Sequence, residues 1–201
     1  MHTICVYLLH TAQVEGKEAA IGALLPEERL VKANRYAFEK DRRLSLAAGY
    51  LVWRYVGEYR VDEHGKPRKE GVCFSLSHSG ELAALAVSIE GEMGLDVECA
   101  DTSRDQESLA TYCLSEGEYR AYREGQSFLS LFTAKESLAK AEGTGLVHDV
   151  KTIPALPIDG RVNYRDKIYF RHGWVIDGYN ISVSHENEDF VLALQEVQVS
   201  F

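Results

Sequence analysis

Two segments of this chain match one another without gaps: FSLSHSGELAALAV at residues 74–87 and ISVSHENEDFVLAL at residues 181–194. Each contains Ser-x-Ser-His followed by an apolar stretch, a pattern typical of two strands around a turn. The segments begin about half of the 201-residue chain apart, which predicts two similar halves, residues 1–99 and 100–201, and not a solenoid. Chance similarity of two strand-turn-strand segments is the alternative.

Strand and helix patterns are mixed along the chain, so we expect an α+β (α/β) fold. Residues 3–9 are rich in Ile, Val and Tyr and predict a strand, whereas residues 40–55 repeat apolar positions at helical spacing. Residues 179–199 again predict strand, turn and strand. We therefore expect a pseudo-dimer of two similar subdomains, each a small antiparallel sheet packed with helices, with the active site in the cleft between them.

Composition excludes several classes of protein. The sequence contains no run of about 18 apolar residues, so we expect no membrane span. It has no basic leader, so we expect no signal peptide. A net charge of −9 argues against binding nucleic acid. Four scattered cysteines without CxxC spacing predict reduced thiols in a cytoplasmic protein, and neither a zinc site nor a disulfide framework. They are Cys5, Cys73, Cys99 and Cys113.

Two carboxylates fall on one predicted strand. Residues 93–98 are MGLDVE, and alternation along a strand places Asp96 and Glu98 on the same face. Neighbouring like charges repel, so the pair requires solvent around an exposed strand end or a cation between the two groups. Mg²⁺ suits the second case, because it prefers one or two carboxylates together with phosphate oxygens and water.

A helix predicted from about Ser127 carries the charged sequence Lys-Glu-Ser-x-x-Lys and ends at a glycine-rich turn with Gly143 and Gly145. Glu136 and Lys140 are four residues apart and share a face, and Lys135 precedes them. A solvated helix with one Glu–Lys pair explains the pattern, and so does a group of charges directed at an anionic ligand. With Asp96 and Glu98 from the other half, the site would offer three carboxylates for a divalent ion and cations for phosphates.

Two further signals concern helices. Ser115-x-x-Glu118 is a capping box that predicts a helix start, and Pro26 followed by two acids predicts another. Residues 29–43 form the most basic stretch, which is either a solvated helix face or a local anion-binding region.

Four motifs in this order and spacing resemble those of the 4′-phosphopantetheinyl transferase superfamily, of the surfactin-synthetase-activating, two-half, monomeric type. They are GKP at 65–67, SLSHSG at 75–80, GLDVE at 94–98 and FTAKESLAKAEGTGL at 132–146. The resemblance covers most of the chain between Pro26 and Leu146. It implies transfer of the 4′-phosphopantetheine moiety of coenzyme A to a serine of an apo acyl or peptidyl carrier protein, with release of 3′,5′-ADP.

The resemblance also implies the setting of the reaction. The enzyme would be a cytoplasmic monomer that depends on Mg²⁺, or on Mn²⁺ in its place, with no nucleic-acid or membrane partner. It would activate carrier proteins of fatty acid, polyketide or nonribosomal peptide biosynthesis. The alternative is a non-catalytic homologue that binds coenzyme A or a carrier protein.

The resemblance assigns roles to charged residues at the reacting phosphate. Asp96, Glu98 and Glu136 would hold the metal ion against the pyrophosphate, and Glu136 would also take the proton from the attacking serine. Lys140 and Lys135 would neutralise charge on the phosphates, so that Asp96 and Lys140 also count among the coenzyme A contacts.

The other implied coenzyme A contacts lie earlier in the chain. Ser77 and His78 would contact the phosphates, and Lys66 and Pro67 would line the nucleotide end. Phe132 stands where the family usually has tryptophan, which is a conservative change. Leu44 stands where an arginine is often found, so that Arg43 or its neighbour Arg42 would take over the contact with the 3′-phosphate.

Overall fold

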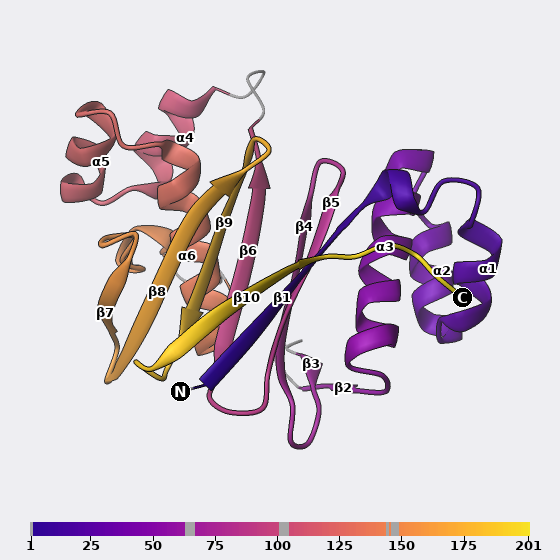
Figure 1. Cartoon of the computed structure of the whole chain (residues 1–201). Helices are drawn as coiled ribbons and strands as arrows, with labels where there is room; N and C mark the ends of the chain where they lie inside the picture. The colour runs from indigo at the N-terminus through magenta and orange to yellow at the C-terminus, as the bar shows by residue number, and fades with distance from the viewer. Residues whose placement is uncertain (1, 63–66, 101–104, 144, 146–148) are drawn as a thin grey trace. The chain divides into compact units, whose positions relative to one another are not determined.

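The structure, a computed structural model, describes residues 2–62, 67–100, 105–143, 145 and 149–201 (Figure 1). It divides the chain into two compact units, one made of Met1–Glu90 with Phe190–Phe201 and the other of Gly91–Asp189. Each unit contains a four-stranded sheet and helices. The predicted mixed α+β fold is therefore confirmed.

The boundaries of these units differ from the predicted halves, 1–99 and 100–201. Strand β6 (Met93–Cys99) pairs with β9 (Tyr179–His185) and packs under a helix of the second unit, and so Asp96 belongs to that unit. Strand β10 (Phe190–Glu196) pairs in parallel with β1 (His2–His10) and belongs to the first unit. Both assignments follow from strand pairing, which a division of the chain at a single residue cannot represent.

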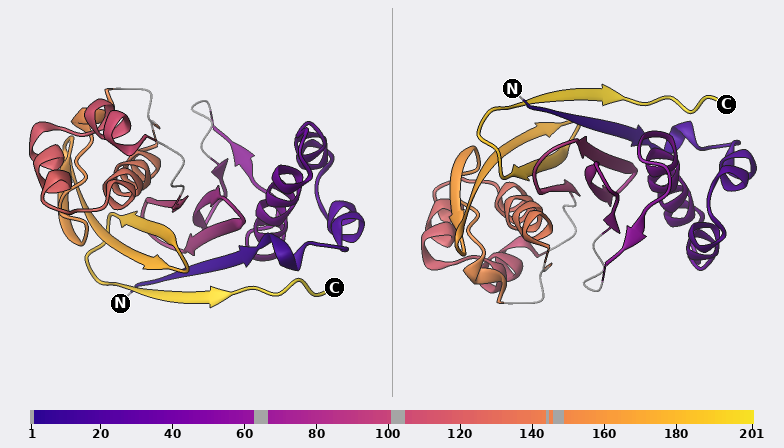
Figure 2. Two further views of the ribbon diagram at one scale, coloured as in Figure 1. Left: turned by 90° about the horizontal axis from the view of Figure 1, so that it is seen from above. Right: turned by 90° about the horizontal axis from the view of Figure 1, so that it is seen from below.

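The sheet of the first unit has the order β10-β1-β5-β4. Strands β4 (Cys73–Ser79) and β5 (Leu82–Ser88) form the predicted antiparallel hairpin, whose turn uses Gly80 at a φ of 58°. Figure 2 shows β10 running beside β1 in both views. Two short strands, β2 (Arg60–Val61) and β3 (Pro67–Arg68), pair separately.

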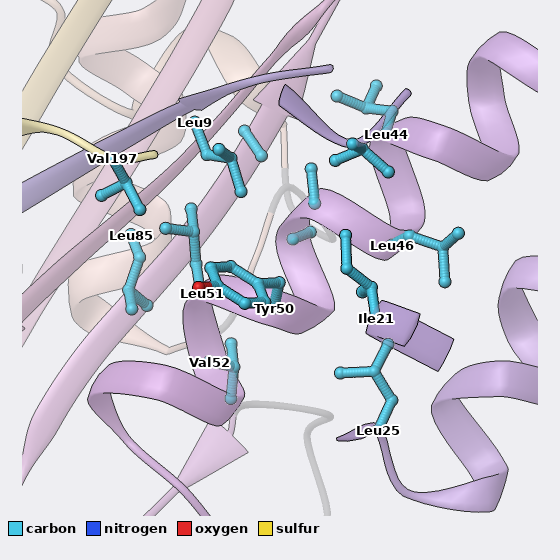
Figure 3. Close-up of a cluster of buried hydrophobic side chains, with 14 of the residues drawn as sticks. Leu9, Ile21, Leu25, Leu44, Leu46, Tyr50, Leu51, Val52, Leu85 and Val197 are labelled. Atoms are coloured by element: carbon cyan, nitrogen blue, oxygen red, sulfur yellow. The ribbon is translucent and has the colours of Figure 1, made fainter. Parts of the chain in front are cut away.

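Helix α3 supplies more buried residues to the core of the first unit than any other described element. It spans Glu39–Tyr55, as its apolar periodicity predicted, and follows α1 (Glu18–Leu24) and α2 (Glu27–Asn34), the latter directly after Pro26. In Figure 3, Leu51 of α3 lies on the side of Leu85 and Val197, from the sheet and the segment after β10, whereas Leu46 lies on the side of Ile21 and Leu25. The labelled residues of this core include Leu9, Tyr50, Leu51, Leu85 and Val197.

The sheet of the second unit has the order β6-β9-β8-β7, with every pair antiparallel. Strands β7 and β8 span Gly160–Tyr164 and Lys167–Ile176. Helices α4 (Gln106–Cys113), α5 (Glu116–Arg123) and α6 (Phe128–Glu142) precede them in the chain. Helix α6 makes its main contacts with β6 and β9.

The second Ser-x-Ser-His segment lies on β9, and β10 follows it as the predicted second strand, but these two strands do not pair with each other as β4 and β5 do. β9 lies between β6 and β8 and forms its hairpin with β8, through a turn in which Asp177 and Gly178 both have positive φ. Such a turn matches the twist of the two strands, and Asp-Gly is a strong signal for it. The repeated segments therefore occupy different places: β4 at a sheet edge and β9 inside a sheet.

No helix within the described ranges is long and apolar enough to cross a membrane.

Candidate functional site

Helix α6 carries the predicted Lys-Glu-Ser-x-x-Lys sequence. Its start is capped by the hydroxyl of Ser127, which accepts a hydrogen bond from the amide of Ser130. It ends at Gly143, whose φ of 96° is the left-handed conformation that suits glycine at a helix exit. The predicted helix and its glycine exit are both confirmed.

Gly94 of the GLDVE motif allows α6 to lie directly on β6. A Cβ atom at this position would lie well inside contact distance of the Ser137 carbonyl and the Ala141 amide, and 2.9 Å from Cβ of Lys140. Backbone atoms of a helix cannot move aside as the end of a flexible side chain can. The motif therefore needs glycine here because of close approach between strand and helix.

This close approach brings Lys140 to Asp96. The Nζ atom of Lys140 lies 2.7 Å from Oδ1 of Asp96, whose side chain is buried, while Lys140 keeps 29% of its side-chain surface exposed. The ion pair joins α6 to β6 and places a positive charge among the predicted metal-binding carboxylates.

Burial and the negative charges of Asp96 and Glu98 together raise the pKa of Glu136 to about 7, against the opposing effect of Lys140. A carboxyl responds in this way when water is scarce and like charges are close. The three carboxylates and Lys140 therefore share one electrostatic environment. Strand β6 and helix α6 thus place these four residues near one another.

The chemistry of this donor set suits a hard divalent cation, since Mg²⁺ takes carboxylate oxygens together with water and phosphate. Among the described residues, however, no three His, Cys, Asp or Glu side chains converge in a geometry that could already hold a metal ion. The positive charge at Asp96 comes from Lys140.

Lys135 does not face this group, and its predicted contact with phosphates conflicts with its surroundings. Its side chain is fully buried, with Nζ 2.7 Å from Oε2 of Glu118 and hydrogen-bonded to the carbonyls of Val150, at 3.2 Å, and Ile153. An ammonium group has three hydrogens, and all three have acceptors. Lys135 therefore connects α6 to its neighbours within the second unit.

Glu118 completes that buried contact. The capping box predicted at Ser115 is present, with one oxygen of Glu118 accepting from the Ser115 amide at 2.8 Å, and the other accepts from Ala155 at 2.6 Å. Burial alone would raise the pKa of Glu118, but hydrogen bonds from Lys135 and these amides outweigh burial and lower it. The capping signal was visible in the sequence, whereas the pairing with Lys135 was not.

The first unit holds the other predicted coenzyme A contacts. Ser77 is buried and His78 exposed on β4, and Pro67 lies on β3, whereas Lys66 lies outside the described residues. These residues belong to the first unit, whereas the three carboxylates belong to the second.

The surroundings of Arg43 conflict with its predicted phosphate contact. Its guanidinium group already pairs with three carboxylates, those of Glu15, Glu18 and Glu39, at 3.4, 2.8 and 2.9 Å. The neighbouring Arg42 has a buried Nε atom that, within the described part of the chain, has no hydrogen-bond partner. Of the two arginines, Arg42 is therefore the one with unused donor capacity.

A polar layer that the sequence patterns did not predict lies under α6, where Ser137 of the helix meets Ser182 and Ser184 of β9. All three side chains are buried. The second Ser-x-Ser-His segment was noticed, but as the counterpart of Ser77 and His78 and not as a partner of the helix.

Comparison with known proteins identifies the family. A family model described as "4′-phosphopantetheinyl transferase superfamily" matches residues 92–195, about half of the chain, including β6 and α6. The chain is 30% identical over 156 residues to 4′-phosphopantetheinyl transferase HetI of Nostoc sp., and the match covers 67% of this chain and 66% of HetI. It is 35% identical over 158 residues to 4′-phosphopantetheinyl transferase AcpT of Salmonella typhi, covering 72% of this chain and 80% of AcpT. The chain is also 30% identical over 129 residues to 4′-phosphopantetheinyl transferase gsp of Aneurinibacillus migulanus, and the match covers 56% of this chain and 53% of gsp. The chain therefore belongs to the 4′-phosphopantetheinyl transferase superfamily.

Proposed function

We propose that this protein transfers the 4′-phosphopantetheine moiety of coenzyme A to a serine of an apo acyl or peptidyl carrier protein and releases 3′,5′-ADP. The observation that carries the proposal is the group of charges where α6 lies on β6: Glu136 stands beside Asp96 and Glu98, and Lys140 pairs with Asp96 at 2.7 Å. Such a group offers a base for the attacking hydroxyl and charges of both signs for a metal ion and phosphates. Family membership supplies the substrate class.

Glu136 would act on the attacking serine. As the serine oxygen forms its bond to the phosphorus on the pantetheine side, the anhydride bond to the second phosphorus breaks and 3′,5′-ADP leaves. The serine proton passes to Glu136, directly or through one water. Lys140, partly exposed beside Asp96, would stabilise the charge that develops on the phosphate oxygens.

Asp96, Glu98 and Glu136 are the residues that would hold Mg²⁺, or Mn²⁺ in its place. A bound divalent ion would neutralise the pyrophosphate and help to orient it. Oxygen ligands that already repel one another favour this assignment, because a cation relieves that repulsion. Lys140 would then turn from Asp96 toward the phosphates.

The first unit would contribute contacts to coenzyme A. The buried Nε atom of Arg42 makes that residue the better candidate for the 3′-phosphate, in place of Arg43, which three carboxylates already engage. Ser77 and His78 remain candidates for the phosphates, and Lys66 and Pro67 for the nucleotide end.

We further propose that the enzyme is a cytoplasmic monomer.

A second candidate is a non-catalytic homologue that binds coenzyme A or a carrier protein. Such a protein would need cations for the phosphates but no carboxylate beside them. The position of Glu136 next to Asp96 and Lys140 therefore favours the enzyme.

One experiment separates the two candidates. Incubating the protein with coenzyme A, Mg²⁺ and several apo carrier proteins should add the mass of one phosphopantetheinyl group to the serine of at least one carrier. Coenzyme A binding, measured by calorimetry without carrier, serves as the control. Binding of coenzyme A with no mass gain on any carrier would support the non-catalytic homologue.

A further inference from the structure

Glu136 is flanked in the sequence by two fully buried side chains, Lys135 and Ser137. Lys135 is fixed by Glu118 and two carbonyl groups, as described above. Ser137 is fixed on the opposite side, against the sheet. The backbone on both sides of Glu136 is therefore tied to its surroundings, and this suggests that its position is closely controlled.

Every hydrogen-bonding group of the Ser137 hydroxyl is used. It donates to the carbonyl of Ala134 at 3.1 Å, and its oxygen lies 3.0 Å from Oγ of Ser182 and 2.9 Å from Oγ of Ser184. A hydroxyl has one hydrogen and two lone pairs. Because the hydrogen goes to Ala134, the two lone pairs accept from the two hydroxyls of β9.

The same chain of hydrogen bonds continues into β8. Oγ of Ser184 accepts from Nε of Arg171 at 3.3 Å. The guanidinium of Arg171, itself buried, also donates to the carbonyls of Ala155 at 2.7 Å, Pro157 at 3.1 Å and Pro154 at 2.9 Å. Arg171 is therefore held by several directional bonds, and Ser184 cannot shift without breaking one of them.

The strand that holds Ser137 is also the partner of the strand that carries Asp96. In the pairing of β6 with β9, Ser182 lies opposite Asp96 and Ser184 lies opposite Gly94. A movement of α6 along β9 is thus also a movement of Glu136 relative to Asp96. The serine contacts define the position of the helix along this direction.

We propose that Ser137, held by Ser182 and Ser184, is a positioning residue that sets the placement of Glu136 relative to Asp96. The inference rests on the proposed function and adds a role for the second Ser-x-Ser-His segment that differs from ligand binding. Small errors in the placement of a reacting group lower the rate strongly, while contacts made elsewhere still bind the substrate.

The matched pair for a test is Ser137→Ala and Thr133→Val. Thr133 lies one turn earlier on α6 and is also buried, but its hydroxyl bonds only within the helix, to the carbonyls of Leu129 at 2.9 Å and Ser130 at 3.2 Å. Both variants lose a buried hydroxyl, and only Ser137→Ala loses the connection to β9. For each, kcat for carrier modification, the Kd of coenzyme A and Tm are measured.

We expect Ser137→Ala to lower kcat about 10- to 100-fold while the Kd of coenzyme A changes by less than about twofold. Thr133→Val should lower Tm and leave kcat within about twofold of wild type. In Ser137→Ala, the hydroxyls of Ser182 and Ser184 both lose their acceptor. The double variant Ser137→Ala with Ser182→Ala removes one of these two donors, so it should regain part of the lost Tm but none of the lost kcat.

If kcat follows Tm across these three variants, Ser137 acts only on stability and the positioning role is refuted. If the wild-type protein binds coenzyme A but modifies no carrier, the proposed function fails and the positioning role fails with it. A fall in kcat that is confined to the two Ser137 variants supports both.

Discussion

Helices α3 and α6 are the longest of their units, and each packs against a four-stranded sheet, yet their interfaces differ in kind. Helix α3 meets its sheet with an apolar surface in which Leu51 is typical. Helix α6 buries Lys135, Thr133 and Ser137 as well as apolar groups. Buried polar groups cost stability unless every hydrogen bond is made, so apolar packing is the easier way to attach a helix. The polar interface of α6 instead gives directional contacts, and it belongs to the helix that carries the candidate site.

The largest effect that we expect is on the rate of carrier modification, and it distinguishes α6 from α3. Glu136→Gln keeps the shape of the side chain but removes the base, so kcat for carrier modification should fall by about 10²- to 10⁴-fold. Glu39→Gln, the same change in the first turn of α3, should leave kcat unchanged. Mass spectrometry of the carrier measures both. Equal rates for wild type and Glu136→Gln would show that another group takes the proton.

The next effect concerns the cost of burying charge. Lys135→Met leaves Glu118 buried without its cation, so the free energy of unfolding should fall by about 3–5 kcal/mol. Arg43→Met in α3 removes a partly exposed cation from three carboxylates and should cost much less. Denaturant unfolding of both variants tests the comparison. A larger loss of unfolding free energy for Arg43→Met than for Lys135→Met would contradict this prediction.

Two glycines sharpen the comparison of packing. Gly94→Ala directs a methyl group into the backbone of α6, and we expect a loss of about 3 kcal/mol or more in the free energy of unfolding. Gly49→Ala in α3 places its methyl group 2.7 Å from Cδ1 of Leu25, the end of a flexible side chain that can turn away. Because alanine also favours the helix, the second variant should lose less than about 1 kcal/mol. Thermal unfolding of both proteins measures the difference.

The smallest effect is a pH dependence within the second unit. The pKa of Glu118 is lower in the folded protein than its ordinary value of 4.5, so its carboxylate stabilises the fold above pH 4.5. That contribution is lost as the pH falls from 4.5 through the folded-state pKa. The gap in unfolding free energy between wild type and Glu118→Gln should therefore narrow below pH 4.5. A gap that stays constant between pH 7 and pH 3.5 would contradict this account of Glu118.

Local patterns in the sequence predicted most of the elements that position the site. Periodicity located the helices of residues 39–55 and 128–142, and alternation located the strand that carries Asp96 and Glu98. The short helices α1 and α4 were not predicted, because seven or eight residues give too little periodicity to stand out.

Long-range pairing was beyond the reach of these patterns. That β9 pairs with β6 and β8, while β10 pairs with β1, follows from contacts between distant segments. The role of Lys135 could have been inferred: Lys135 and Lys140 are five positions apart, about 140° around a helix of 3.6 residues per turn, and cannot face one ligand together. The same helical geometry that places Glu136 and Lys140 on one face places the two lysines on different faces.

The pairing of β10 with β1 has a consequence for synthesis on the ribosome. Residues 91–189 form one continuous stretch, so the second unit can fold as soon as that stretch has emerged. The first unit begins earlier but lacks a strand of its sheet, and Val197 of its core, until residues 190–199 have been made. The segment that is translated first is therefore completed last, and β1 has an unpaired edge in the nascent chain.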